Sequence, residues 1–331
     1  MAMRALVTGA GGFIGANLCR RLLHDGHSVH AVVRPAADTW RLATIRSEIT
    51  LHERDLRDAV GLRATLDSAR ADWLFHLAAH GAYSWQTETG AIFATNALAS
   101  AELVEMACAR GFEAFVQAGS ASEYGFKNHP ADESEWIDPN SSYAVSKAAA
   151  THYARAAALA HGGHIVTLRL CSAYGLWEEP RRLIPTLAMF GHQGRLPPLV
   201  DPETAFDFIF VDDVCEAFVR AACATDLEPG TVFNVGSGVQ TTLAELVELA
   251  RNELAIDEQP CWSTMASRPW NTTLWAVDCT RIHTKLGWWP RWSLAEGFRS
   301  VVDWLSQDSL TRARYAHAMT TPLKRRPASG Y

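Results

Sequence analysis

Residues 7–15 read VTGAGGFIG, with a glycine at every third position from Gly9. The apolar run Arg4–Thr8 before them predicts a strand, and the pattern over 14–24 predicts a helix. Such glycines allow a tight turn and let the backbone approach an anion, toward which the helix N-terminus points its free N–H groups. We therefore predict a dinucleotide-binding turn. The expected cofactor contacts are Gly9, Gly12, Phe13, Ile14 and Gly15.

Further apolar runs of strand length follow, each separated from the next by sequence of helix length. They are Ser28–Val33, Trp73–Ala78, Ala114–Ala118 and Ile165–Leu170. This alternation is typical of a parallel sheet that is covered by helices on both faces. The predicted fold class is therefore α/β: a Rossmann-type, doubly wound parallel sheet with a smaller C-terminal substrate lobe.

The composition of the chain changes after Leu170, where prolines, glycines and tryptophans become frequent. This change indicates a second, looser lobe. We expect a dinucleotide-binding domain over residues 1–170, to which 205–238 returns, and a mainly substrate-binding lobe over 171–310. Residues 311–331 are expected to form a flexible tail.

The bulk composition restricts the possible partners and the compartment. The chain has 331 residues, of which 48% are hydrophobic and 20% charged, and its net charge is −6. These values are typical of a soluble globular protein and give no footprint for nucleic acid or an anionic membrane. The seven cysteines are scattered without metal-ligand spacing, which favours a reducing compartment and no metal site. With no signal peptide and no apolar run near 20 residues evident, we expect a cytoplasmic protein.

The end of the second predicted strand indicates which dinucleotide is bound. Residues 31–35 read AVVRP, with no acid to bind the ribose hydroxyls and with Arg34 in place to clamp a 2′-phosphate. Arg34, helped by Arg41, therefore favours NADP(H), with NAD(H) still possible and a solvated arginine as the alternative interpretation. Further expected cofactor contacts are Asp55 and Leu56 at the adenine edge and Leu77, Ala78 and Ala79 along the cofactor path.

Tyr143 and Lys147 lie four residues apart at the start of an alanine-rich helix, so they share a face. A free tyrosine has a pKa near 10, and a nearby ammonium lowers the pKa toward the working range. Ser120 follows an upstream strand and can hold the substrate oxygen. Ser120, Tyr143 and Lys147 are therefore the predicted catalytic residues, with Tyr143 as the acid/base.

Together these motifs resemble those of one family, the extended short-chain dehydrogenases/reductases of the NAD(P)-dependent epimerase/dehydratase type. The resemblance covers nearly the whole chain. It rests on TGAGGFIG, His76–Ala79, Asn96, GSASEYG, YAVSK, Leu168–Gly175, Phe208–Val214, Phe233–Gly238 and Leu286–Pro290. It implies a nucleotide-sugar substrate, with Asn96 as a further contact at the cofactor. It also implies a homodimer formed through the alanine-rich helices 92–110 and 142–161.

Within this family, the residues after Ser120 bear on the reaction. Sugar 4,6-dehydratases carry an acidic pair where Ala121 and Ser122 stand, and Glu123 comes one place later, where a strand would turn it to the other face. We therefore expect dehydration to be unlikely. A 4-ketoreductase of a nucleotide (deoxy)hexose is favoured, and a 4-epimerase with a tightly held cofactor is the alternative.

The substrate lobe departs from the family pattern, which leaves the nucleotide base open. The expected substrate contacts are Ser120, Ser122, Ser172, Arg182, Arg195 and Arg268. Two hypotheses from other classes remain: an NADPH reductase of a small non-sugar carbonyl, and a catalytically idle NADP-binding regulator.

Overall fold

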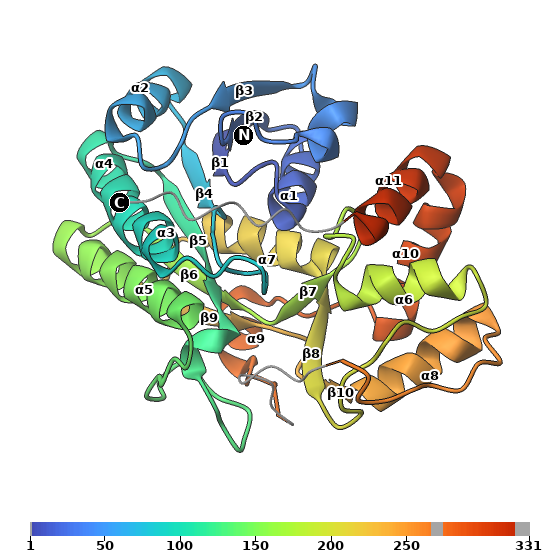
Figure 1. Cartoon of the computed structure of the whole chain (residues 1–331). Helices are drawn as coiled ribbons and strands as arrows, with labels where there is room; N and C mark the ends of the chain where they lie inside the picture. The colour runs from blue at the N-terminus through green and yellow to red at the C-terminus, as the bar shows by residue number, and fades with distance from the viewer. Residues whose placement is uncertain (1, 266–273, 322–331) are drawn as a thin grey trace.

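The computed structural model describes residues 2–265 and 274–321 and has two lobes (Figure 1). The larger lobe is built on a seven-stranded parallel sheet of order β3-β2-β1-β4-β5-β6-β9. Its strands are β1 (Arg4–Thr8), β2 (Ser28–Val33), β3 (Ile49–Glu53), β4 (Trp73–His76), β5 (Ala114–Ser120), β6 (Ile165–Leu170) and β9 (Val232–Val235). The strand order reverses at β1, so the carboxyl ends of β1 and β4 border the crevice in which such folds bind ligands.

This sheet confirms the predicted Rossmann-type α/β fold, although two strand ends differ from the sequence pattern. β4 ends two residues earlier than expected, at His76, and β5 ends two residues later, at Ser120. β4 ends there because the chain turns toward β1, where Ala78 N donates to the Thr8 hydroxyl over 3.4 Å. The longer β5 places Ser120 at the edge of the sheet.

Helices cover both faces of the sheet (Figure 1). They are α1 (Phe13–His24) and α7 (Val211–Cys223) on one face, and α2 (Ala59–Ala69), α4 (Ala99–Arg110) and α5 (Ser142–His161) on the other. Successive side chains of a strand point to opposite faces. Val7 therefore belongs to the core under α1 and α7, whereas Leu6 belongs to the core under α2, α4 and α5. The short helix α9 (Thr280–Leu286) contacts β9.

The helix expected over 92–110 is interrupted. It consists of α3 (Thr89–Phe93), a π-helical turn η2 (Ala94–Leu98) and α4. Contrary to expectation, Thr89–Arg110 is by length and composition alone apolar enough to cross a membrane, because an 18-residue window within it has a mean hydropathy of 1.2. However, 44% of this window is buried, and α4 packs against α2 and α5. Much of its apolar surface is therefore used in packing.

The smaller lobe has its own sheet and its own core. Its three-stranded sheet has the order β10-β8-β7, with β8 parallel to β7 and antiparallel to β10. Its elements are β7 (Ser172–Tyr174), β8 (Ala205–Phe210), β10 (Gln240–Thr242), α6 (Leu183–Gly191), α8 (Leu243–Leu254), α10 (Leu294–Gln307) and α11 (Ser309–Thr320). The core between them contains Tyr174, Phe210 and Phe298.

Two boundaries differ from those expected. Of the segment 205–238, α7 and β9 return to the large lobe, but β8 joins the small sheet because it pairs with β7 and β10. The tail expected from residue 311 is instead the helix α11 up to Thr320, and residues 322–331 lie outside the described residues. Tyr315 holds this helix in place, since its ring is fully buried and its hydroxyl donates to Glu178 O over 2.5 Å.

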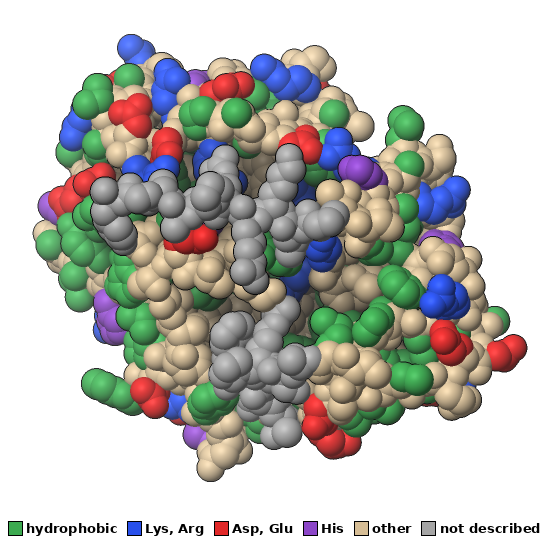
Figure 2. Space-filling model, in the orientation of Figure 1, with side chains coloured by type: hydrophobic (Ala, Val, Ile, Leu, Met, Phe, Trp, Pro, Cys, Tyr) green, Lys and Arg blue, Asp and Glu red, His purple; other side chains and the backbone are tan. Residues whose placement is uncertain are grey.

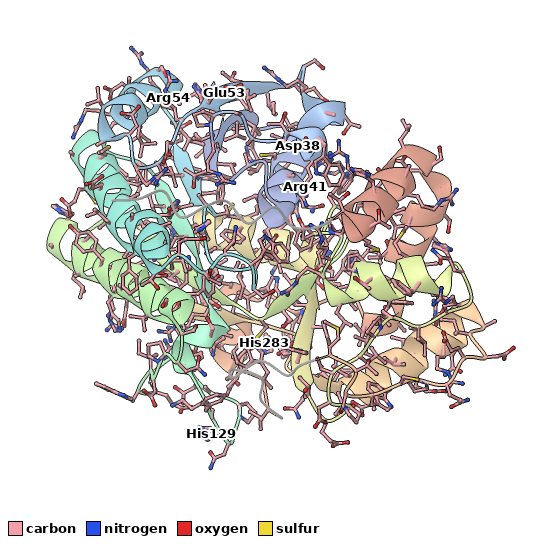
Figure 3. All side chains as sticks on the ribbon, viewed as in Figure 1. Asp38, Arg41, Glu53, Arg54, His129 and His283 are labelled. Carbon is pink, nitrogen blue, oxygen red and sulfur yellow. The ribbon has the colours of Figure 1, made fainter. Side chains whose placement is uncertain are left out.

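The two lobes are joined at Trp177, which has a left-handed backbone with φ of 62°. Arg20 of α1 lies over its indole ring at 3.8 Å, and Arg41 Nε donates to its carbonyl oxygen over 2.6 Å. Figure 3 shows Arg41 and Asp38 on the side of the large lobe that faces α11. There Arg314 of α11 forms an ion pair with Asp38 at 2.6 Å. These contacts fix the small lobe against the helix that follows the glycine turn.

Candidate active site

The turn between β1 and α1 is shaped by glycine. Gly9 has φ of 68°, and a Cβ placed on it would lie 2.6 Å from Ala78 N. A Cβ at Gly15 would collide with the carbonyl of Gly9. Side chains therefore cannot fill the turn, and the backbone is left open to a ligand.

The N-terminus of α1 offers donors to that ligand. Among the described residues no side chain caps it at Gly12, and the helical bonds begin with Ala16 N donating to Gly12 O over 3.0 Å. The N–H groups of the first turn, including those of Phe13 and Ile14, therefore lack helical carbonyl partners. This donor set fits the pyrophosphate of a dinucleotide, as the sequence predicts.

The opposite wall of this turn is formed by Leu77, Ala78 and Ala79, which follow β4. Leu77 N donates to Thr8 O over 3.2 Å, which holds this segment against β1. Below it, His76 is buried and bridges the hydroxyls of Thr8 (2.7 Å) and Ser100 (2.8 Å). Burial lowers the pKa of His76 to about 3, so its ring is neutral and serves as a structural link.

The residues expected around the adenosine differ in their availability. Arg34 is exposed directly after β2, where it can meet a ligand. Asp55 is paired with Arg57 at 2.6 Å, and hydrogen bonds from Arg57 lower its pKa to about 2. Leu56 is buried in the core. Arg41, expected to help Arg34, is buried and bound to the Trp177 carbonyl, so that part of the expectation is wrong.

The three predicted catalytic residues come together where β5 meets α5. Ser120 ends β5, and its hydroxyl lies 2.7 Å from that of Ser122. Tyr143 and Lys147 lie in the first two turns of α5. Lys147 Nζ donates to the carbonyl of Ala118 over 2.5 Å. Ser120 also forms a side-chain hydrogen bond with Tyr143.

The protonation of this pair differs from the expected one. Burial and the charge of Glu123 raise the pKa of Tyr143 to about 12, against the opposing effects of the Ser120 hydrogen bond and Arg182. Burial lowers the pKa of Lys147 to about 8. We expected Lys147 to lower the pKa of Tyr143, but desolvation of both groups dominates and Lys147 is directed at a carbonyl. Tyr143 is therefore protonated at neutral pH.

Asn96 occupies the π-helical turn and is fully buried. Its amide donates to His80 O (2.7 Å) and to the Ser146 hydroxyl (2.9 Å), and its oxygen accepts from His80 N (2.8 Å). These bonds tie the loop after β4 to α5. Asn96 therefore positions the site through His80 and Ser146, in place of the direct cofactor contact that we expected.

Glu123 was not recognised from the sequence as a structural residue of the site. It is fully buried in the short 3-10 turn η3 (Ala121–Tyr124), and Arg169 Nε of β6 donates to it over 2.9 Å. Its carboxylate also accepts from Ser120 N (2.8 Å) and the Thr151 hydroxyl (3.1 Å). Glu123 points away from the cleft as expected, but because of this turn and not because of strand alternation. The spacing Ser-x-x-Glu is the signal of such a capping box.

The opposite side of the site is formed by Glu178, Arg182 and Tyr83. Arg182 precedes α6, and its Nε donates to Glu178 Oε1 over 3.3 Å. Burial raises the pKa of Glu178 to about 7, and its Oε2 has no partner among the described residues. Both Arg182 and Tyr83, which lies in the loop after β4, act electrostatically on the pKa of Tyr143.

The other expected substrate contacts are dispersed. Ser122 and Ser172 are half-buried at the ends of β5 and β6, as the large sheet gives way to η3 and β7. Arg195 is exposed beyond the far end of α6, a helix of nine residues and about 13 Å, so the structure does not bring it to Arg182. Arg268 lies outside the described residues.

Figure 2 shows Lys and Arg side chains in the hollow between the lobes. Their positive charge is suited to binding phosphate groups.

The chain matches known proteins along most of its length. A model described as the NAD dependent epimerase/dehydratase family matches residues 5–236. A dTDP-glucose 4,6-dehydratase of Streptomyces griseus is 32% identical, over 92% of this chain and 94% of that protein. A UDP-glucose 4-epimerase of Mycolicibacterium smegmatis is 30% identical, over 93% of this chain and 100% of that protein. The structure of a UDP-glucose 4-epimerase of Thermus thermophilus in complex with NAD has a TM-score of 0.81 at 27% identity, over 91% and 98% of the two chains.

These relatives correct one expectation. We judged 4,6-dehydration unlikely because Ala121 and Ser122 stand where an acidic pair is typical. That judgement is wrong, since several relatives at comparable identity are dTDP-glucose 4,6-dehydratases, including one of Streptomyces antibioticus at 28%. The residues after Ser120 therefore do not exclude dehydration.

Proposed function

The chain belongs to the NAD-dependent epimerase/dehydratase family, and we propose that it reduces a 4-keto nucleotide sugar with Tyr143 as the acid. The observation that supports this proposal is that Ser120, at the end of β5, meets Tyr143 and Lys147 in the first two turns of α5. Burial and the charge of Glu123 raise the pKa of Tyr143 to about 12, so its phenol is a proton donor. Reduction of a ketone requires a proton donor at the carbonyl oxygen, and a phenol of this kind keeps its proton until the oxygen becomes basic.

The residues divide the reaction between them. When bound, a reduced nicotinamide dinucleotide supplies the hydride that goes to the carbonyl carbon. Tyr143 gives its proton to the carbonyl oxygen, so that the ketone becomes an alcohol. Ser120 donates a hydrogen bond to the same oxygen and stabilises the charge that develops there. Lys147, whose Nζ donates to the Ala118 carbonyl, contributes a positive charge on the same helix face as the phenolate that Tyr143 becomes.

The proposal includes NADP(H) as the preferred cofactor. Arg34 is exposed directly after β2, and residues 31–35 contain no carboxylate that would repel a 2′-phosphate. A solved structure with this fold contains NAD, so the test compares NADPH with NADH. We expect Arg34→Ala to raise KM for NADPH about tenfold with little effect on KM for NADH. An equal change for both cofactors would contradict the preference.

The relatives favour two further reactions, 4-epimerisation and 4,6-dehydration. One experiment separates the three. The purified protein is incubated with 4-keto and 4-hydroxy sugars of UDP, dTDP, CDP and GDP, with and without NADPH. Loss of nicotinamide absorbance together with a 4-hydroxy product supports reduction, whereas epimer formation without net cofactor loss indicates an epimerase. Formation of a 4-keto-6-deoxy product without added reductant indicates a dehydratase, and no response to any nucleotide sugar removes this substrate class.

The proposal also includes a cytoplasmic homodimer. α5 exposes Val145, Tyr153 and Leu159, and the adjoining helical segment exposes Leu98, which is 60% accessible. Helices with apolar and small residues on one face suit close pairing with a second copy. Gel filtration with light scattering tests this, and a stable monomer at micromolar concentration would contradict it.

A further inference from the structure

Glu123 connects the two elements that carry the catalytic residues. Its Oε1 accepts from Ser120 N at the end of β5 and from the hydroxyl of Thr151 on α5. Thr151 follows Lys147 by four residues and Tyr143 by eight, so all three lie on one face of the helix. One carboxylate oxygen therefore fixes the strand end of Ser120 against the helix of Tyr143 and Lys147.

The surroundings of Glu123 are built to hold a charge. Arg169 pairs with its other oxygen at 2.9 Å, and these two side chains are 4% and 0% exposed. Arg169 stands beside Gly119 in the β5–β6 register. A Cβ on Gly119 would lie 2.9 Å from Glu123 Oε1 and 3.2 Å from Arg169 Cγ. The absence of a side chain at Gly119 thus makes room for the ion pair directly beneath the catalytic serine.

Several groups face Tyr143 and Lys147 from the surrounding elements. Arg182, which precedes α6 of the small lobe, and Tyr83, in the loop after β4, act electrostatically on Tyr143, and Ser120 of β5 forms a hydrogen bond with it. His76 of β4 lies near Lys147 but is neutral. Glu123 is the carboxylate that acts on both residues, and its charge raises the pKa of Tyr143 and of Lys147 alike.

We propose that Glu123 is a positioning residue: it fixes Ser120 against α5 and places a buried negative charge between that strand end and the helix that carries Tyr143 and Lys147. The proposal deepens the proposed function and rests on it, because it concerns the acid of that reaction. Its physical basis is that a negative charge shielded from solvent favours the protonated form of each neighbouring titratable group.

The test follows Lys147 by NMR in the full-length protein. The sequence has four lysines, Lys127, Lys147, Lys285 and Lys324, so the side-chain resonances of lysine labelled with 13C and 15N can be assigned with Lys147→Arg. Glu123→Gln keeps an acceptor for Ser120 N and Thr151 but removes the charge. We expect Lys147 to titrate roughly one pH unit lower than in the wild type. The basic limb of kcat against pH should move by the same amount.

Glu133→Gln is the matched control. Glu133 is also a buried carboxylate, which accepts from Asn234 N over 2.7 Å and pairs with Arg281 at 3.4 Å. It is not among the groups that act on Lys147, so its removal should leave the Lys147 titration within about 0.2 units. Equal shifts in the two variants would overturn the proposal, because they would reflect general loosening.

Glu123→Gln leaves Arg169 buried without its partner, so this variant risks poor folding. The double variant Glu123→Gln, Arg169→Met removes both charges, and Lys147 should still titrate lower, though by less. An unchanged titration in a folded variant overturns the proposal. Since the NMR readout needs no substrate, a protein that turns over no nucleotide sugar but shows the shift refutes the proposed function and keeps the role of Glu123.

Discussion

The two sides of the candidate active site each carry a Glu–Arg pair, and the pairs differ in burial. On the sheet side, Glu123 and Arg169 are 0% and 4% exposed and 2.9 Å apart. On the small-lobe side, Glu178 and Arg182 are 4% and 40% exposed and 3.3 Å apart. Glu123 has further donors in Ser120 and Thr151, whereas Glu178 Oε2 has no partner within the described parts of the chain.

This difference follows from how each side is built. The sheet side is fixed by the register of two parallel strands, which sets Arg169 opposite Gly119. The small-lobe side is a loop between β7 and α6. Such a loop can carry a carboxylate that has a hydrogen bond on only one of its two oxygens. Among the described residues each pair leaves one buried atom without a hydrogen bond, Arg169 Nη1 and Glu178 Oε2, so the difference lies in how many donors hold each carboxylate. We infer that the sheet side holds the chemistry and that the small-lobe side adapts to the substrate.

The largest expected effect comes from exchanging one phenol on each side. Tyr143→Phe should lower kcat about 10²–10⁴-fold, because it removes the proton donor. Tyr83→Phe should keep kcat within about tenfold of the wild type. Steady-state kinetics with the best nucleotide sugar measures both, and circular dichroism checks that both variants are folded. A Tyr143→Phe variant with full turnover would remove Tyr143 from the chemistry.

The next effect concerns stability and compares the two arginines. Arg169→Met leaves the Glu123 carboxylate buried and unpaired, which should cost about 3–5 kcal/mol of unfolding free energy. Arg182→Met should cost about 0–1 kcal/mol, because Arg182 is exposed and Glu178 can keep a proton. Urea unfolding at pH 7 measures both. Equal losses would mean that burial does not distinguish the pairs.

A smaller effect is the pH dependence due to Glu178, whose pKa burial raises from 4.5 to about 7. A carboxyl group with a raised pKa in the folded state contributes stability below pH 4.5 that is lost as the pH rises through 7. Because one pKa unit corresponds to about 1.4 kcal/mol, this loss is about 3 kcal/mol at most. Glu178→Gln should abolish it, so the variant gains stability relative to wild type between pH 5 and pH 8. A constant difference between the two proteins across this range would contradict the expectation.

The smallest effect separates binding from chemistry. Arg182→Met should raise KM for the nucleotide sugar about tenfold, because the substrate loses one charged contact. It should leave kcat nearly unchanged. Ser120→Ala on the sheet side should instead lower kcat. Initial rates over a range of substrate concentrations give both constants. If Arg182→Met lowered kcat alone, the small-lobe side would take part in the chemistry.

Several features were predictable because they depend on neighbours along the chain. The glycine turn needs only the residues between β1 and α1. Helix α5 matches its predicted bounds because Ser141 caps its start, accepting from Ala144 N, and Gly162 ends it with φ of 67°. Ser120, Tyr143 and Lys147 come together because the carboxyl end of β5 and the start of α5 meet at one edge of the sheet.

Other features depend on residues far apart in the sequence. The partner of Glu123 is 46 residues away, and Tyr315 of the helix that we expected to be a tail binds a carbonyl 137 residues away. Arg41 is bound to Trp177, 136 residues away, so it cannot serve the cofactor as expected. No local pattern predicts such pairings.

The sequence by itself therefore determined the α/β fold, the glycine turn and the meeting of Ser120, Tyr143 and Lys147 at one edge of the sheet. Only the tertiary structure decided the protonation of that set, the buried pair beneath Ser120 and the contacts between the lobes. The physical reason is that backbone geometry follows from adjacent residues, whereas desolvation and charge depend on whatever the fold brings close.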